Sequence, residues 1–159
     1  MPDVGQPAPT FTLPSSEGGE VSLESLRGQP VVLYFYPKDD TPGCTRQACA
    51  IRDSWDEFRK AGAVVLGVSP NSVESHRRFR DKYGLPFPLL ADEDHAVAEA
   101  YGAWGEKKNY GKTYFGIIRS GFVIDADGTL AAAKLNINAD KHREWALAAL
   151  ERLSAAHAG

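Results

Sequence analysis

The two cysteines of the 159-residue chain, Cys44 and Cys49, are its most chemically suggestive residues. Cys44 follows Thr41-Pro42-Gly43, and a threonine before a proline is typical of the cap and first position of a helix. Cys44 then lies in the first helical turn, near unpaired amide groups and the positive end of the helix dipole. Cysteines in such positions ionise more readily than a free thiol. The spacing therefore predicts a nucleophilic thiolate at Cys44.

A thiolate of this kind can attack a peroxide oxygen and form a sulfenic acid, which condenses readily with a second thiol. Cys49 is the only other thiol in the sequence. The alternative is that both cysteines are small core residues, since free cysteine is among the most buried residue types. That alternative stays open for Cys49 and is weaker for Cys44, whose cap context is specific. A close pair with no export signal fits a cytoplasmic protein, where disulfides tend to be transient and catalytic.

The elements around the cysteines read as a strand, a helix and a second strand. Residues 31–36 (VVLYFY) and 63–68 (AVVLGV) are short, unbroken apolar runs, which indicates strands buried on both faces. Residues 41–60 carry apolar side chains at helical spacing. We therefore predict a βαβ unit with Cys44 at the junction of its first strand and its helix.

The rest of the chain predicts further alternation and an antiparallel return. Asn71 and Asn138 are the expected helix caps, and Asp127-Gly128 is a hairpin signal. This pattern predicts a single domain over residues 1–159, an α/β thioredoxin-like sandwich with a central mixed sheet flanked by helices. The expected elements are a helix at 71–83, a strand at 87–90, a helix at 92–101, a long loop at 102–116, strands at 117–124 and 130–137, and a helix at 138–156.

Composition argues against several classes of partner. The formal net charge is −3 and the estimated pI is 5.8, so we expect no nucleic acid or anionic membrane as a partner. The apolar run at residues 31–36, which no other wholly apolar run exceeds in length, is far shorter than the ~18 residues of a membrane span. The four histidines form no zinc-type spacing with the cysteines, so we expect no metal.

The segment from Pro37 to Cys49 resembles a known family. Pro37, Thr41 and Cys44 match the peroxiredoxin pattern P-x-x-x-T/S-x-x-C. The C-x4-C pair is similar to that of the bacterioferritin-comigratory-protein, or peroxiredoxin Q, subgroup. Further similarity lies at residues 5–11, 66–69, 92–95, 104–107 and 119–125.

The resemblance implies a role for each matching residue. Cys44 would be the peroxidatic cysteine and Cys49 the resolving cysteine, joined to it in an intramolecular disulfide. Thr41 would hydrogen-bond the thiolate and the peroxide, and Pro37 would shield the sulfur. Arg119 would steady the thiolate and polarise the peroxide, because a cation stabilises charge that moves from sulfur to the leaving oxygen.

Two neighbouring residues qualify this assignment. Gln47, one turn beyond Cys44, is a candidate to support the hydrogen bonds that Thr41 and Arg119 would make around the sulfur. In the family's arginine-bearing strand, a β-branched or small polar residue is expected where this sequence has Gly121. Glycine loosens a strand interior, so we expect the orientation of the Arg119 side chain to be less well fixed. Taken without the resemblance, Arg119 would be interpreted as an ordinary surface arginine.

The function that follows is the reduction of hydrogen peroxide and organic hydroperoxides, with recycling by thioredoxin or a similar dithiol protein. We expect no bound cofactor, and a monomer. A thiol–disulfide oxidoreductase is disfavoured because the pair is C-x4-C rather than C-x-x-C. A copper carrier is disfavoured by the cap before Cys44 and by the lack of a membrane or export signal. Trp104, Tyr110 and Tyr114 either line a substrate mouth or cover a core edge.

Overall fold

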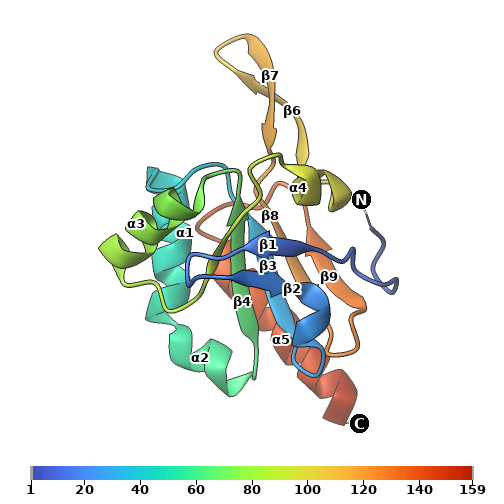
Figure 1. Cartoon of the computed structure of the whole chain (residues 1–159). Coiled ribbons are helices and arrows are strands. Elements are labelled where there is room, and N and C mark those ends of the chain that lie inside the picture. The colour runs from blue at the N-terminus through green and yellow to red at the C-terminus, as the bar shows by residue number, and fades with distance from the viewer. Residues whose placement is uncertain (1, 159) are drawn as a thin grey trace.

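A computed structural model describes residues 2–158, and its centre is a five-stranded mixed sheet (Figure 1). The strand order is β5-β4-β3-β8-β9. The first three strands pair in parallel, and β8 and β9 join them antiparallel. The predicted central mixed sheet is confirmed. The strands are β3 (Val31–Phe35), β4 (Val64–Ser69), β5 (Leu89–Ala91), β8 (Ser120–Ile124) and β9 (Leu130–Lys134).

The central strand β3 is buried on both faces, as the apolar run predicted. Val31, Leu33 and Phe35 point into one hydrophobic cluster, and Val32 and Tyr34 point into the other. This alternation follows from the two-residue period of a strand. Both faces of the sheet must therefore be covered by other elements.

The two covering layers are of different kinds (Figure 1). Leu13, Leu23 and Ala98 belong to the first cluster, from the N-terminal strands and two short helices. Ala48 and Ala146 belong to the second, from longer helices. The first layer comprises β1 (Thr12–Pro14), β2 (Glu20–Ser22), the 3-10 helix η1 (Leu23–Leu26) and α4 (Ala96–Ala100); the second comprises α1 (Pro42–Asp53), α2 (Trp55–Lys60), α3 (Val73–Tyr83) and α5 (His142–Ala158).

The helix predicted over residues 41–60 is interrupted. Ser54 ends α1 and precedes α2, with backbone angles (φ −110°, ψ 19°) outside the helical range. Its hydroxyl accepts a hydrogen bond from Arg143 of α5, at 2.9 Å. The apolar periodicity in the sequence carries no sign of this contact, so the sequence predicted one continuous helix.

The prediction of a long loop over residues 102–116 is wrong, because this segment forms a β-hairpin. Strands β6 (Trp104–Asn109) and β7 (Lys112–Ile117) pair antiparallel and project from the body of the protein (Figure 1). Tyr110 and Gly111 form the turn with φ values of 52° and 77°. A tyrosine is not the residue expected there, and most side chains of the hairpin face solvent, so the usual turn and alternation signals are missing.

The strand predicted over residues 117–124 is divided. Ile118 and Arg119 lie between β7 and β8, because β7 pairs in the projecting hairpin whereas β8 pairs with β3. The Asp127-Gly128 hairpin between β8 and β9 is confirmed, with Gly128 at a φ of 90°.

Both predicted asparagine caps are displaced. Ser72, not Asn71, caps α3 and accepts from the Ser75 amide at 3.2 Å. Asn138 accepts from the Asp140 amide in a turn that precedes α5. Within residues 2–158, no helix combines the length and the apolar character that a membrane crossing requires.

Candidate active site

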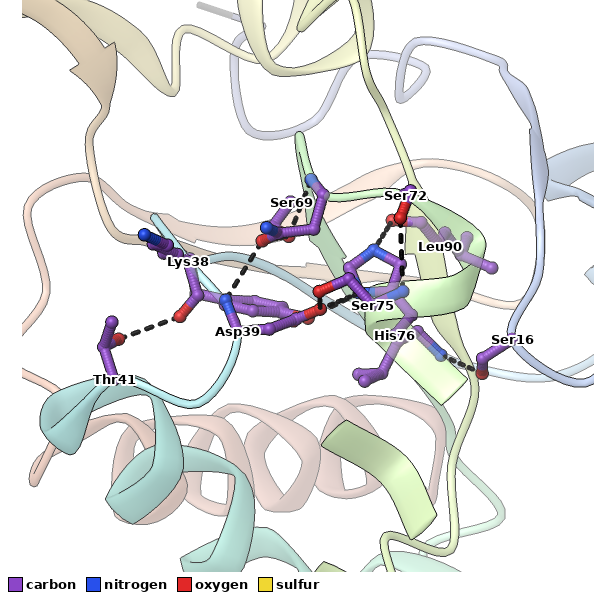
Figure 2. Close-up of polar contacts among 12 residues, drawn as sticks. Ser16, Lys38, Asp39, Thr41, Ser69, Ser72, Ser75, His76 and Leu90 are labelled. Carbon is purple, nitrogen blue, oxygen red and sulfur yellow. Dashed lines mark hydrogen bonds and ion pairs between the residues drawn. The ribbon is translucent and has the colours of Figure 1, made fainter. Parts of the chain in front are cut away.

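The peroxidatic candidate lies where β3 gives way to α1. Thr41 occupies the cap position with extended backbone angles (φ −98°, ψ 155°), and Pro42 and Cys44 follow in the first turn, as the sequence predicted. The Thr41 side chain makes no cap hydrogen bond; its hydroxyl donates to the Lys38 carbonyl at 2.8 Å (Figure 2). The amides of the first turn are therefore left without this cap, which keeps them available to stabilise an anion.

Arg119 lies directly against the sulfur of Cys44. Its Nη2 donates to Sγ at 3.3 Å, and the Cys44 residue is only 2% exposed. A Cβ atom at Gly43 would lie 3.3 Å from the same Nη2, so the glycine leaves room for the guanidinium. A fixed cation and the helix N-terminus together stabilise negative charge on this sulfur.

Gln47 binds the other terminal nitrogen of the Arg119 guanidinium. It is fully buried one turn beyond Cys44, and its Oε1 accepts a hydrogen bond from Arg119 Nη1. The sequence pointed to Gln47 as a possible support, and this contact is the support it provides. The bidentate position of Arg119 between Gln47 and Cys44 fixes the guanidinium plane.

Cys49 is partly buried on the same helix and is a free thiol, as is Cys44. Five residues of α-helix separate two Cα atoms by about 8.7 Å and rotate their side chains about 140° apart. A disulfide usually requires a Cα separation of about 4.4–6.8 Å. The structure therefore brings Cys44 and Arg119 together but leaves the two cysteines too far apart for a bond while α1 is intact.

Pro37 and Arg119 line an open pocket of about 650 Å³. Its wall includes the apolar side chains of Ile118 and Ile137 and, from the hairpin, Lys107. Burial, and next the charge of Arg119, lower the pKa of Lys107, whose Nζ donates to the Ile117 carbonyl at 2.7 Å. The resemblance covered Lys107 in residues 104–107 but gave it no role.

Gly121, which looked like a departure, is required by its neighbours. It pairs with Tyr34 across β3 and β8, and a Cβ atom there would lie 2.9 Å from Trp145 and 3.0 Å from His142. Glycine thus permits α5 to pack closely on the strand that follows Arg119. The expected loosening is not seen, because every residue of β8 is buried and Gly121 is paired on both sides.

His142 is a fully buried histidine that the sequence did not single out. Burial, and next the charge of Arg119, lower its pKa to about 3. Within residues 2–158, neither of its ring nitrogens has a hydrogen-bond partner. The side chain is therefore neutral at pH 7. The described residues also contain no group of three or more histidine, cysteine or acidic side chains placed to hold a metal ion.

The sequence model of the AhpC/TSA family matches residues 4–133. The chain belongs to this family. Peroxiredoxin Bcp of Escherichia coli is 49% identical over 143 residues, which is 90% of this chain and 92% of that protein. Peroxiredoxin Bcp of Bacillus subtilis is 46% identical over 96% of this chain and 97% of its own length. The chain is therefore a peroxiredoxin, an enzyme that reduces peroxides with a thiol, as the resemblance implied.

Solved structures agree with this assignment. The bacterioferritin comigratory protein of Xanthomonas campestris, studied for its alkyl peroxide reduction activity, is 39% identical. It superposes with a TM-score of 0.88, and the match covers 99% of this peroxiredoxin and all of that protein. The thioredoxin-like fold predicted from the order of the elements is thereby confirmed.

Proposed function

We propose that this peroxiredoxin works through Cys44 as the attacking thiolate and Cys49 as the resolving thiol. The Cys44 sulfur attacks one peroxide oxygen, the O–O bond breaks, and the other oxygen leaves as water or an alcohol after it gains a proton. Cys44 becomes a sulfenic acid. Cys49 then attacks that sulfur, a disulfide forms and water leaves. An external dithiol reduces the disulfide by exchange and is itself oxidised.

The observation that carries this assignment is the 3.3 Å contact between Arg119 Nη2 and Cys44 Sγ. The cation stabilises the thiolate before the attack and the charge that passes to the leaving oxygen during it. The Thr41 hydroxyl donates its one proton to the Lys38 carbonyl rather than to the Cys44 sulfur. Its lone pairs are therefore free to accept a hydrogen bond from the incoming peroxide. Pro37 lines the same pocket as Arg119. We assign to it the shielding of the sulfur that the resemblance implied.

The substrate class is hydrogen peroxide together with organic hydroperoxides. The Xanthomonas relative is known for alkyl peroxide reduction. The pocket beside Arg119 offers apolar contacts to an alkyl group through Ile118, Leu135 and Ile137. We assign the reductant to thioredoxin or a similar dithiol protein, and we take residues 1–159 as one domain that acts as a cytoplasmic monomer.

The test is peroxide-dependent NADPH consumption in the presence of thioredoxin and its reductase. The native chain should turn over, and Cys44→Ser should not, because a serine hydroxyl is not appreciably ionised at neutral pH. Undiminished turnover in Cys44→Ser would remove Cys44 from the reaction. Replacing hydrogen peroxide with an alkyl hydroperoxide in the same assay tests the substrate class.

A further inference from the structure

The loop between β3 and α1 is anchored by a buried polar network centred on Asp39 (Figure 2). Asp39 Oδ1 accepts from the Tyr36 hydroxyl at 2.6 Å, and Oδ2 accepts from the Ser75 hydroxyl at 2.8 Å. Oδ2 also lies 2.7 Å from His76 Nδ1. The side chains of His76 and Asp39 are 0% and 4% exposed. A buried carboxylate with three partners is held in one position.

His76 ties this carboxylate to the sheet. Its Nε2 lies 2.9 Å from the Leu90 carbonyl in β5, and a carbonyl only accepts, so Nε2 donates. One further proton lies between Nδ1 and Asp39 Oδ2, because neither two lone pairs nor two protons can face each other at 2.7 Å. The imidazole is thus a rigid bridge between the loop and β5.

The network reaches the active site through the loop backbone. The Asp39 amide donates to Asn71 at 3.0 Å, and the adjacent Lys38 carbonyl accepts from the Thr41 hydroxyl (Figure 2). Fixing Asp39 therefore fixes the group that orients Thr41. The side-chain partners of Asp39 lie in the loop itself and in α3, and His76 carries the link to β5. None of these contacts involves α1, the helix that must open to join Cys44 and Cys49.

We propose that Asp39 and His76 are positioning residues for the peroxide step: they hold the loop that carries Pro37 and leads to Thr41 in its reactive position, through contacts that do not involve α1. Neither side chain is among the hydrogen-bond partners of the Cys44 sulfur. The inference rests on the proposed function of Cys44. It implies that loss of the Asp39–His76 contact slows attack on the peroxide and spares reduction of the disulfide, in which α1 is already open.

Two substitutions at His76 separate the two ends of the bridge. His76→Asn places a side-chain NH2 at the distance of Nδ1 and preserves donation to Asp39 while it loses Leu90. His76→Gln reaches the distance of Nε2 and preserves donation to Leu90 while it loses Asp39. Both remove the ring, so the two variants should show similar losses of thermal stability. A slower rate in His76→Gln than in His76→Asn then reports on the Asp39 contact, and the opposite order would overturn the proposal.

The rate of Cys44 oxidation is measured by rapid mixing with hydrogen peroxide in a Cys49→Ser background, where only the first step occurs. We expect His76→Gln to be about tenfold slower than the parent, since small displacements of catalytic groups cost factors of this order, and His76→Asn to be much closer to the parent. In chains that retain Cys49, disulfide reduction by thioredoxin should be unchanged in both variants. Equal oxidation rates in the two variants, or slower disulfide reduction in His76→Gln, would overturn the positioning role.

A milder variant and a control complete the test. Ser75→Ala removes one donor to Asp39 without opening a large cavity, and we expect oxidation about threefold slower, the size of one lost hydrogen bond. If the His76 variants do not fold, an unchanged rate in Ser75→Ala overturns the proposal. Lys82→Met removes an exposed contact of the same loop, to Asp40, and should change the rate by less than about twofold. Failure of the Cys49→Ser parent to react with peroxide would instead contradict the proposed function.

Discussion

The guanidinium of Arg119 lies 3.3 Å from the sulfur of Cys44, although the two residues are 75 positions apart in the sequence. Arg119 lies in the connection between β7 and β8, two strands that belong to different sheets. Cys44 lies at the start of α1, after β3, and β3 pairs with β8. The contact therefore exists because strand pairing places the end of one connection beside the start of a helix.

Replacing this arginine should reduce the reactivity of Cys44. In a Cys49→Ser background, Arg119→Met should slow alkylation of Cys44 by iodoacetamide at pH 7 by about tenfold, because a hydrogen bond to a charged group contributes about 1.5–3 kcal/mol. Arg46→Met is the matched control, since Arg46 is exposed on the same helix and pairs with Asp140. Equal alkylation rates in the native and Arg119→Met chains would show that the guanidinium does not act on the sulfur.

Removing the second thiol should trap the first intermediate. Cys49→Ser leaves no other cysteine to condense with the Cys44 sulfenic acid, so this species should accumulate after one equivalent of peroxide and react with dimedone. Mass spectrometry of the labelled peptide locates the adduct. Thioredoxin-dependent turnover should fall sharply at the same time. Normal turnover with no trapped adduct would remove Cys49 from the mechanism.

Formation of the disulfide should open the first part of α1. The intact helix holds the two Cα atoms about 8.7 Å apart, beyond the usual 4.4–6.8 Å range. Amide hydrogen exchange over residues 41–52 should therefore accelerate on oxidation, while β3, buried on both faces, serves as the internal reference. A proven Cys44–Cys49 disulfide with unchanged protection throughout α1 would contradict this step.

Acid should destabilise the protein through His142. Burial and Arg119 lower its pKa to about 3 in the folded state, against about 6.5 in an unfolded chain. The unfolded state therefore binds the extra proton between these values, and the free energy of unfolding falls as the pH drops below about 6.5, by up to about 1.4 kcal/mol per pH unit.

The variant His142→Leu isolates this contribution. It has similar volume and no proton to bind, so its urea unfolding midpoint should fall less between pH 7 and pH 4.5 than that of the native chain. At pH 8 the unfolding free energies of both chains should be insensitive to this titration. Parallel acid profiles for the native and His142→Leu chains would show that His142 does not titrate on unfolding.

The sequence sufficed for features that depend on neighbouring residues. The apolar run at residues 31–36 determines a strand buried on both faces, and Thr41-Pro42 determines where the next helix begins. Together they place Cys44 in the first turn, because strand burial, proline geometry and cap position are local properties. The resemblance pointed to Arg119, but no local pattern distinguished it from a surface arginine.

Tertiary structure decided the contacts that give those local features their chemistry. The approach of Arg119 to Cys44, the glycine at position 121 that admits His142, and the bridge from Asp39 through His76 each join segments far apart in the chain. The spacing of apolar residues along the chain does not predict these contacts. They form when strand pairing and helix packing bury polar side chains, which then need hydrogen-bond partners. The sequence by itself therefore determined which cysteine lies at the start of a helix, and the packed fold decided which groups surround and position its sulfur.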